Sequence, residues 1–194
     1  MRVAGKVVGD PQGEELALIA AARDGDARAF ERLLSLHEAR VYRVLRLLGV
    51  AQADRDDVAQ NTFLRIFRGL DGFTAGRRFD SWVYKIAVNA ARDWRERSDR
   101  RRQDEAAWEP DRDEDHVQQG PGAGERLELA RRLEAALALL TDRERAVFVL
   151  VEMEEMDRAE VAKTLGITQI TVRRHLSLAK DRLRDALERK ATRL

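Results

Sequence analysis

The sequence predicts an all-α protein made of two small helical domains joined by a flexible linker. Three observations predict this class. Apolar residues recur at three- and four-residue steps through most of the 194 residues, which is the period of an amphipathic helix. Charged residues make up 37% of the chain, which suits solvated helix faces more than sheets. The helical pattern stops between Ser98 and Gly124, where an acidic run precedes three glycines and a proline.

This break divides the chain. We expect a flexible N-terminus at residues 1–13, a first domain at 14–98, a linker at 99–124 and a second domain at 125–194. The linker carries seven Asp or Glu residues between positions 104 and 115. Few of its side chains can be buried, so we expect it to be flexible.

Capping signals set the helices of the first domain. Asp26 is expected to cap a helix that Gly49 ends, and Asp54 to cap the next one. Residues 71–78 form a loop, and a further helix runs from about Asp80 to Arg97. The apolar residues expected to point inward on the second of these helices are Val58, Phe63, Ile66, Phe67 and Leu70.

The second domain has stronger signals. The run from Thr141 to Glu144 has the form of a capping box, and Asp157 opens a second capping signature. The helix after Asp157 ends at Gly166, and Thr168 is expected to cap the last helix. That helix carries the apolar residues Ile170, Val172, Leu176, Ala179 and Leu183.

Residues 157–183 therefore form a helix-turn-helix, which makes the second domain a helix-turn-helix domain. Ala162 permits close approach of the two helices, and Gly166 permits the positive φ of the turn. Such a turn presents the second helix to a DNA major groove. The residues offered to DNA are Thr168, Gln169, Thr171, Arg173, Arg174, His175 and Lys180. An ordinary helical hairpin with a charged outer face is the alternative.

Charge distribution adds a second candidate contact with a polyanion. The net charge is only +1, but residues 77–102 hold nine Lys or Arg against four Asp or Glu, and residues 169–194 hold eight against three. Within the first stretch, Lys85, Asn89 and Arg92 share one helix face. Two basic stretches suggest two nucleic-acid contacts, although two solvated faces explain the charges equally well.

Composition excludes several classes of function. The chain has no cysteine, so disulfides and thiolate zinc sites are excluded. Its three histidines, His37, His116 and His175, lack ligand spacing and are expected at surface or half-buried positions. We therefore expect no metal and no cofactor. No apolar run approaches membrane-spanning length, so we expect no membrane contact and a cytoplasmic location.

Three motifs taken together resemble the extracytoplasmic-function (ECF) sigma factors of the sigma-70 family. The run from Asp57 to Leu64 resembles their polymerase-binding helix, and the run from Phe79 to Asn89 their promoter-melting segment. The run from Leu139 to Arg145 and the helix-turn-helix resemble their domain that reads the −35 promoter element. The order and spacing of the motifs make the resemblance specific, and it extends over residues 14–187 outside the linker.

The resemblance implies a role for each group of residues. Asp56, Asp57, Gln60, Phe63 and Leu64 would bind the β′ clamp helices of core RNA polymerase, whose β subunit is also a partner. The loop from Phe73 to Arg78, including Arg77, would hold a base flipped from the −10 element. Lys85, Asn89 and Arg92 would contact the neighbouring strand of promoter DNA. An anti-sigma factor would restrain the chain, which would not itself be an enzyme.

Three other functions compete with this one. A stand-alone helix-turn-helix repressor or activator would explain the second domain but not the motifs of the first. A metal-dependent enzyme would use Asp54, Asp56 and Asp57, but these also suit a helix start. A pure protein adaptor would leave two basic stretches unexplained.

Overall fold

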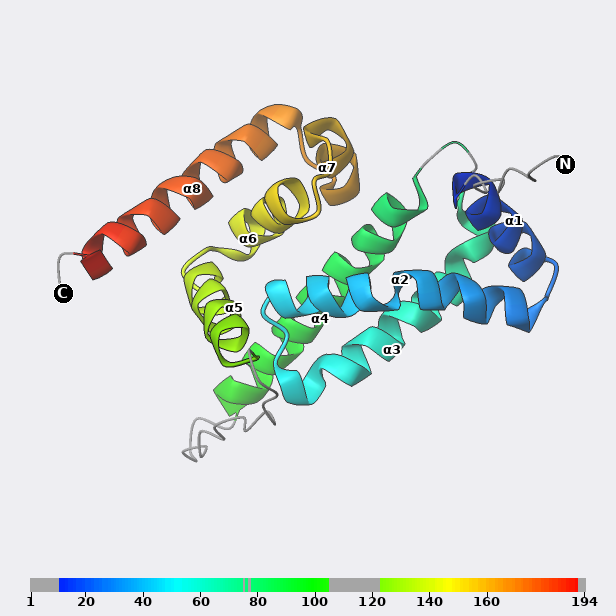
Figure 1. The fold of residues 1–194 in the computed structure, drawn as a ribbon, viewed down its shortest axis with the longest axis horizontal. Coiled ribbons are helices and arrows are strands. Elements are labelled where there is room, and N and C mark those ends of the chain that lie inside the picture. The colour runs from blue at the N-terminus through cyan, green and yellow to red at the C-terminus, as the bar shows by residue number, and fades with distance from the viewer. Residues whose placement is uncertain (1–10, 75, 77, 105–122, 192–194) are drawn as a thin grey trace, which may run out of the picture.

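The computed structural model describes residues 11–74, 76, 78–104 and 123–191, and every regular element in those ranges is helical (Figure 1). The first group of elements is α1 (Pro11–Arg23), α2 (Ala27–Leu47), α3 (Gln52–Gly69), the 3₁₀ turn η1 (Leu70–Gly72) and α4 (Phe79–Asp104). The second group is α5 (Ala123–Leu137), α6 (Asp142–Phe148), the π-helical turn η2 (Val149–Met153), α7 (Arg158–Leu165) and α8 (Gln169–Ala191).

Helix α2 is the centre of the first group, because it packs against α1, α3 and α4. Its apolar residues recur every three or four positions and are almost fully buried, among them Leu33, Val41 and Leu45. The expected cap at Asp26 is confirmed, since its carboxylate accepts hydrogen bonds from the backbone N–H groups of Arg28 and Ala29.

Three expectations for this group are wrong. Helix α3 begins earlier than expected, with Ala51 as its N-cap, so Asp54 lies in the first turn instead of capping it. Phe67 was expected inward, but its side chain is 57% exposed and packs edge-on against Phe30. Helix α4 extends to Asp104, beyond the expected end at Arg97.

The second group confirms its capping signals. Thr141 and Glu144 form a reciprocal capping box at the start of α6, and Asp157 caps α7. Gly166 ends α7 in the left-handed conformation with φ of 65°, as the helix-turn-helix requires. The assignment of residues 99–124 to a linker stays a prediction, since α4 and α5 occupy its two ends and residues 105–122 lie outside the described ranges.

The two groups are packed against each other. One buried apolar cluster includes residues of both, from Val83 and Ala87 on α4 to Val161 and Ala162 on α7. Polar contacts reinforce it at Glu154, which follows η2 and has a side chain only 1% exposed. Its Oε2 accepts hydrogen bonds of 2.6 Å from Tyr84 on α4 and from Arg43 on α2.

A second polar contact joins the groups at the C-terminal end of α2. The carbonyl oxygen of Leu48 accepts hydrogen bonds from Arg95 on α4 (2.7 Å) and from Arg145 on α6 (3.1 Å). Arg145 also donates to the carbonyl oxygen of Leu137. Its pKa is lowered to about 10 by burial and by the nearby charge of Arg95. The negative end of the α2 dipole helps to stabilise these two cations.

Two features of this contact favour glycine at position 49. Its φ is 85°, and a Cβ atom there would overlap the guanidinium of Arg145. Gly25 also has a left-handed φ, of 90°, but a Cβ atom would meet nothing within 4 Å. Comparing substitutions at Gly25 and Gly49 therefore distinguishes the cost of backbone strain from the cost of the steric conflict with Arg145.

We predict that Gly49→Ala destabilises the protein more than Gly25→Ala. Gly25→Ala introduces only the left-handed strain, about 1 kcal/mol, whereas Gly49→Ala also displaces Arg145 and its hydrogen bond, adding about 1 kcal/mol or more. Chemical unfolding of both variants measures the two losses. Equal losses would mean that Arg145 moves aside without cost.

Candidate nucleic-acid interface

The helix-turn-helix is built from short-range interactions. After Gly166, the hydroxyl of Thr168 accepts a hydrogen bond from the backbone N–H of Thr171 at 3.1 Å and so caps α8 as expected. The two threonine hydroxyls also lie 2.8 Å apart and share a hydrogen bond. The start of α8 is therefore fixed in place by its own first turn.

A small core sets the angle between α7 and α8. Val161 and Ala162 from α7 are buried together with Val172 and Leu176 from α8. Ile170 does not belong to this core, because its side chain is 75% exposed. The exposed residues at the beginning of α8 are Gln169, Ile170, Arg173, Arg174, Ser177 and Leu178.

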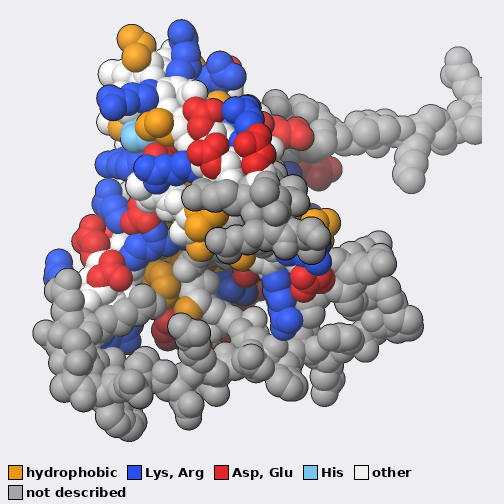
Figure 2. Space-filling model, turned by 90° about the vertical axis from the view of Figure 1, so that its left-hand side faces the viewer, with side chains coloured by type: hydrophobic (Ala, Val, Ile, Leu, Met, Phe, Trp, Pro, Cys, Tyr) orange, Lys and Arg blue, Asp and Glu red, His pale blue; other side chains and the backbone are white. Residues whose placement is uncertain are grey.

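The structure places most of the residues expected at the −35 element on this surface. Thr168, Gln169, Arg173 and Arg174 are exposed, whereas Thr171 and His175 are half-buried. Figure 2 views the end of the molecule that carries α8 and shows Lys and Arg side chains beside exposed apolar ones.

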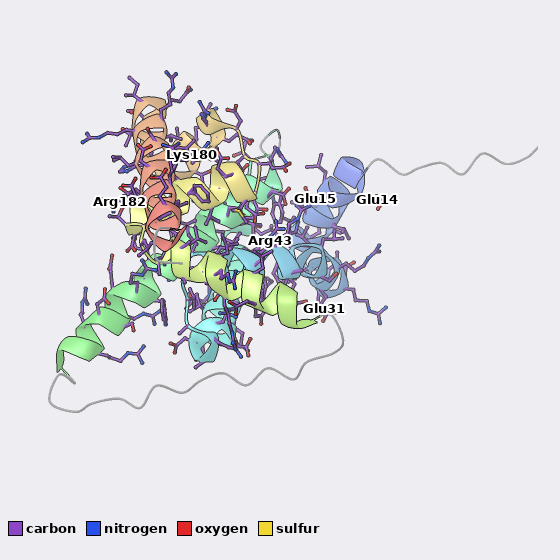
Figure 3. The ribbon with its side chains drawn as sticks, turned by 60° about the vertical axis from the view of Figure 1, so that its left-hand side comes forward. Glu14, Glu15, Glu31, Arg43, Lys180 and Arg182 are labelled. Atoms are coloured by element: carbon purple, nitrogen blue, oxygen red, sulfur yellow. The ribbon has the colours of Figure 1, made fainter. Side chains whose placement is uncertain are left out.

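Two basic residues farther along α8 form ion pairs with carboxylates on α6 and η2. Lys180, which was expected to contact DNA, lies 2.9 Å from Glu152 on η2. Arg182 lies 2.9 Å from Glu144 on α6 (Figure 3). Both ion pairs tie α8 to the body of its domain, so the free basic surface lies nearer the N-terminus of the helix.

The residues expected at the −10 element come from the loop before α4 and from α4 itself. Phe73 is 3% exposed and packs edge-on against Phe79, so it supports the loop from inside. Arg23 on α1 donates hydrogen bonds to the carbonyl oxygens of Leu70 and Phe73, a constraint that the sequence did not reveal. Arg78 is exposed, and Arg77 lies outside the described residues.

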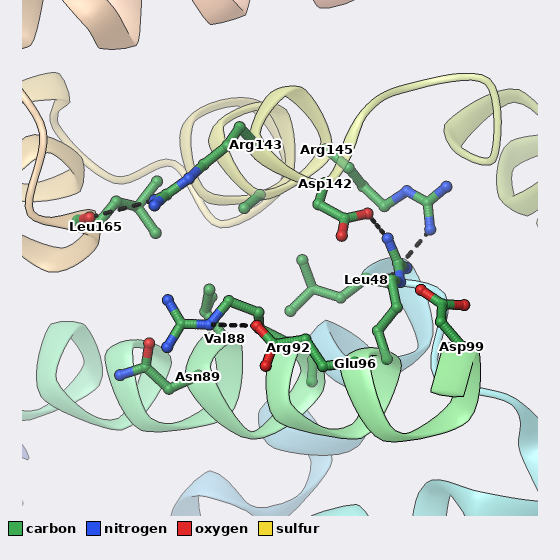
Figure 4. Close-up of a pocket in the computed structure, with 13 residues that line it drawn as sticks. Leu48, Val88, Asn89, Arg92, Glu96, Asp99, Asp142, Arg143, Arg145 and Leu165 are labelled. Carbon is green, nitrogen blue, oxygen red and sulfur yellow. Dashed lines mark hydrogen bonds and ion pairs between the residues drawn. The ribbon is translucent and has the colours of Figure 1, made fainter. Parts of the chain in front are cut away.

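On α4, Lys85 and Arg92 are exposed, whereas Asn89 is half-buried. Asn89 and Arg92 line a cleft of about 270 Å³ between α4 and α6 (Figure 4). Arg143 and Arg145 face them from the second group of helices. The second domain therefore covers part of the α4 surface that was expected to touch DNA.

The residues expected to bind polymerase gather on the outer face of α3. Asp56, Asp57 and Gln60 are exposed, and Leu64 is 51% exposed. Phe63 is half-buried and packs on the core. This face therefore carries two carboxylates and a half-exposed leucine side by side.

A histidine that the sequence placed at or near the surface is instead buried in the first domain. His37 is 3% exposed. Its Nε2 lies 2.9 Å from Glu15 on α1, and its Nδ1 lies 3.2 Å from Asp80 on α4. The three residues are close enough to hold a cation, but each ring nitrogen already faces a carboxylate. That arrangement suits a protonated imidazole that donates twice.

The pKa values of this cluster follow from its contacts. Burial lowers the pKa of His37, but hydrogen bonds to Asp80 and Glu15 outweigh burial, so the pKa lies above 6.5. The hydrogen bond from His37 and the ion pair with Arg40 lower the pKa of Asp80 to about 2. Because Asp80 stands at the start of α4, the cluster fixes that end of the helix to α1 and α2.

Together, these features define a DNA-binding protein of two helical domains. No helix in the described ranges is both long and apolar enough to cross a membrane. The sequence matches two protein families, Sigma-70 region 2 over residues 33–101 and Sigma-70, region 4 over residues 130–183.

Comparisons with full-length proteins agree with these matches. The chain is 32% identical over 189 residues to the RNA polymerase sigma factor CnrH of Cupriavidus metallidurans, covering 92% of this chain and 97% of CnrH. It is 30% identical over 175 residues to the ECF RNA polymerase sigma factor SigM of Mycobacterium tuberculosis, covering 90% and 85% of the two chains.

Solved structures show the same fold. CnrH in complex with the cytosolic domain of CnrY superposes with a TM-score of 0.68 at 27% identity, over 90% of this chain and 97% of that one. RpoE in complex with the anti-sigma factor NepR from Bartonella quintana gives a TM-score of 0.69 at 20% identity, over 84% and 98%. The chain belongs to the sigma-70 family and, within it, to the ECF sigma factors. It therefore directs promoter-specific initiation by RNA polymerase.

The His37 cluster predicts a characteristic dependence of stability on pH. A raised histidine pKa adds stability below pH 6.5 that is lost as the pH rises through the folded-state pKa. The advantage of the wild type over His37→Gln in free energy of unfolding should therefore be largest near pH 5 and shrink in alkali.

Asp80→Asn provides the opposite control. A lowered carboxylate pKa adds stability above pH 3.8 that is lost as the pH falls toward about 2. The advantage of the wild type over this variant should persist in alkali, where Arg40 still binds Asp80 at 2.6 Å, and fade in acid. Chemical unfolding across the pH range distinguishes the two profiles, and a flat His37→Gln difference would contradict a protonated His37.

Proposed function

We propose that the exposed first turns of α8 read the −35 promoter element. The observation that carries this proposal is the basic surface of Gln169, Arg173 and Arg174, which the helix-turn-helix holds clear of its own core. Arg can bind guanine and Gln can bind adenine through two hydrogen bonds each. Thr168 lies at the edge of this surface, where phosphate contacts position a helix in the groove. Lys180 joins these contacts by exchanging its ion pair with Glu152 for a phosphate.

The −10 element binds the loop before α4 together with Lys85, Asn89 and Arg92. Support comes from the exposure of Lys85 and Arg92 and from the packing that holds the loop against Arg23. Asn89 faces the cleft below α6. Full contact with the −10 strand therefore needs the second domain to move away, and the packed arrangement is a resting state.

The outer face of α3 binds core RNA polymerase through Asp56, Asp57, Gln60 and Leu64, against the clamp helices of β′. Phe63 supports this face from the core side. Support for this assignment comes from the exposure of Asp56, Asp57 and Gln60 together with Leu64, which is 51% exposed, on one face of the helix.

An anti-sigma factor holds the resting state closed. RpoE of Bartonella quintana was solved with such a partner, and CnrH with the cytosolic domain of CnrY. The chain acts in the cytoplasm, where RNA polymerase works, and it acts through binding, with no reaction of its own.

Run-off transcription with bacterial core polymerase and a pooled promoter library tests the −35 assignment. We predict that Arg173→Ala and Arg174→Ala each weaken promoter binding by about 1–3 kcal/mol where the arginine contacts a guanine, and change the −35 sequences recovered. Arg184→Ala, about 15 Å farther along α8, is the matched control and should leave them unchanged. Unaltered −35 sequences in both test variants would refute the assignment.

The resting state gives a separate prediction. Glu154→Gln weakens the acceptor shared by Tyr84 and Arg43, so the variant should have a larger radius of gyration in small-angle X-ray scattering and bind core polymerase more tightly. Glu155→Gln removes the charge of an exposed neighbour and should match the wild type. A Glu154→Gln variant as compact as the wild type would show that the other contacts, the apolar packing and the hydrogen bonds to Leu48, are enough to keep the domains together.

A further inference from the structure

Ile170 is the most exposed large apolar residue among those that the structure describes, with a side chain 75% exposed. It is the second residue of α8. The core of the helix-turn-helix is complete without it, since Val172 and Leu176 fill the inner face of the same helix. An isoleucine at this position contributes little to folding and faces solvent in the free chain.

The surroundings of Ile170 indicate what covers it. Arg173 and Arg174 follow at three and four residues, so they lie on the same face of the helix. Both are exposed, as is Gln169. An apolar side chain between cations and an amide suits a surface that is polyanionic at its edges and carries an apolar group in the middle. The DNA major groove has that character, because phosphates flank the exposed methyl group of thymine.

The position of Ile170 is also well defined. Thr168 and Thr171 fix the first turn of α8 through the hydrogen bonds between them. A β-branched side chain on a helix keeps essentially one χ1 rotamer. Ile170 therefore meets the groove in one orientation, which is what a contact with a single methyl group requires.

We propose that Ile170 contacts the C5 methyl group of one thymine in the −35 element and selects a T·A pair at that position. This inference rests on the proposed role of α8 as the −35 reader. Ile170 has no hydrogen-bonding group in its side chain, so its preference comes from apolar contact alone. It rejects cytosine, which has no methyl group at C5, and it does not distinguish bases through their polar edges.

The test removes single methyl groups from DNA. Holoenzyme assembled from core polymerase and the full chain binds a promoter fragment recovered from the library. Each thymine of the −35 element, on either strand, is replaced in turn by deoxyuridine, which lacks only the methyl group. For the wild type, one replacement should weaken binding about three- to fivefold, as expected for loss of one buried methyl group.

The same series with Ile170→Ala completes a double-mutant cycle. The variant should bind the unmodified promoter more weakly than the wild type, and deoxyuridine at the sensitive position should then have no effect. Leu178→Ala is the matched control, because Leu178 is an exposed apolar residue of the same helix about 12 Å farther on. It should keep the sensitivity of the wild type to the methyl group.

Three outcomes would overturn the proposal. The first is a wild type that is insensitive to deoxyuridine at every −35 thymine, and the second is an Ile170→Ala variant with undiminished sensitivity. The third is an Ile170→Ala variant that keeps its −35 preference but loses affinity for core polymerase, which would make Ile170 a protein contact. Failure of the underlying −35 assignment is recognised separately, by Arg173→Ala and Arg174→Ala leaving the preferred −35 sequence unchanged.

Discussion

The carbonyl oxygen of Leu48 is the point on which the arrangement of the two domains depends. It ends α2, the central helix of the first domain, and it accepts hydrogen bonds from α4 and α6 at once. Arg145 brings a buried charge to this point, and its described hydrogen-bond partners are carbonyl oxygens. Removing those acceptors would leave a desolvated cation without compensation, which is costly. The end of α2 thus fixes where α6 can sit.

Because α6 lies there, DNA can reach the proposed −35 surface on α8 more easily than the proposed −10 surface on α4. Helix α8 lies on the side of α6 that is turned away from α2 and α3 (Figure 1), and Arg173 and Arg174 at its start are exposed. The face of α4 that holds Asn89 instead lines the cleft below α6. One interdomain contact therefore leaves the −35 surface open and partly covers the −10 surface.

Local features of the fold could be predicted from the sequence. The caps at Asp26, Thr141 and Asp157, and the left-handed Gly166, each depend on residues within four positions of one another. All the residues that form such a cap are close together in the sequence, so the pattern can be recognised without knowing the fold. The helix-turn-helix and its exposed arginines were found for the same reason.

Features that depend on distant residues could not be predicted. His37 lies between carboxylates 22 positions before it and 43 after it in the chain, and no spacing rule links the three. The contacts between the domains could not be predicted either, because nothing in the sequence distinguishes Glu154 and Arg145 from charged residues on a solvated helix face.

The buried apolar clusters that the two domains share have a thermodynamic consequence for the affinity of the chain for polymerase. If only open molecules bind, the apparent dissociation constant equals the intrinsic one divided by the fraction of molecules that are open. Every interaction that stabilises the contact between the two domains, such as the 2.6 Å hydrogen bond from Tyr84 to Glu154, reduces the fraction of open molecules. Affinity is therefore tunable by residues that never touch the polymerase, and a substitution that makes the free protein more stable can make it a weaker competitor for the enzyme.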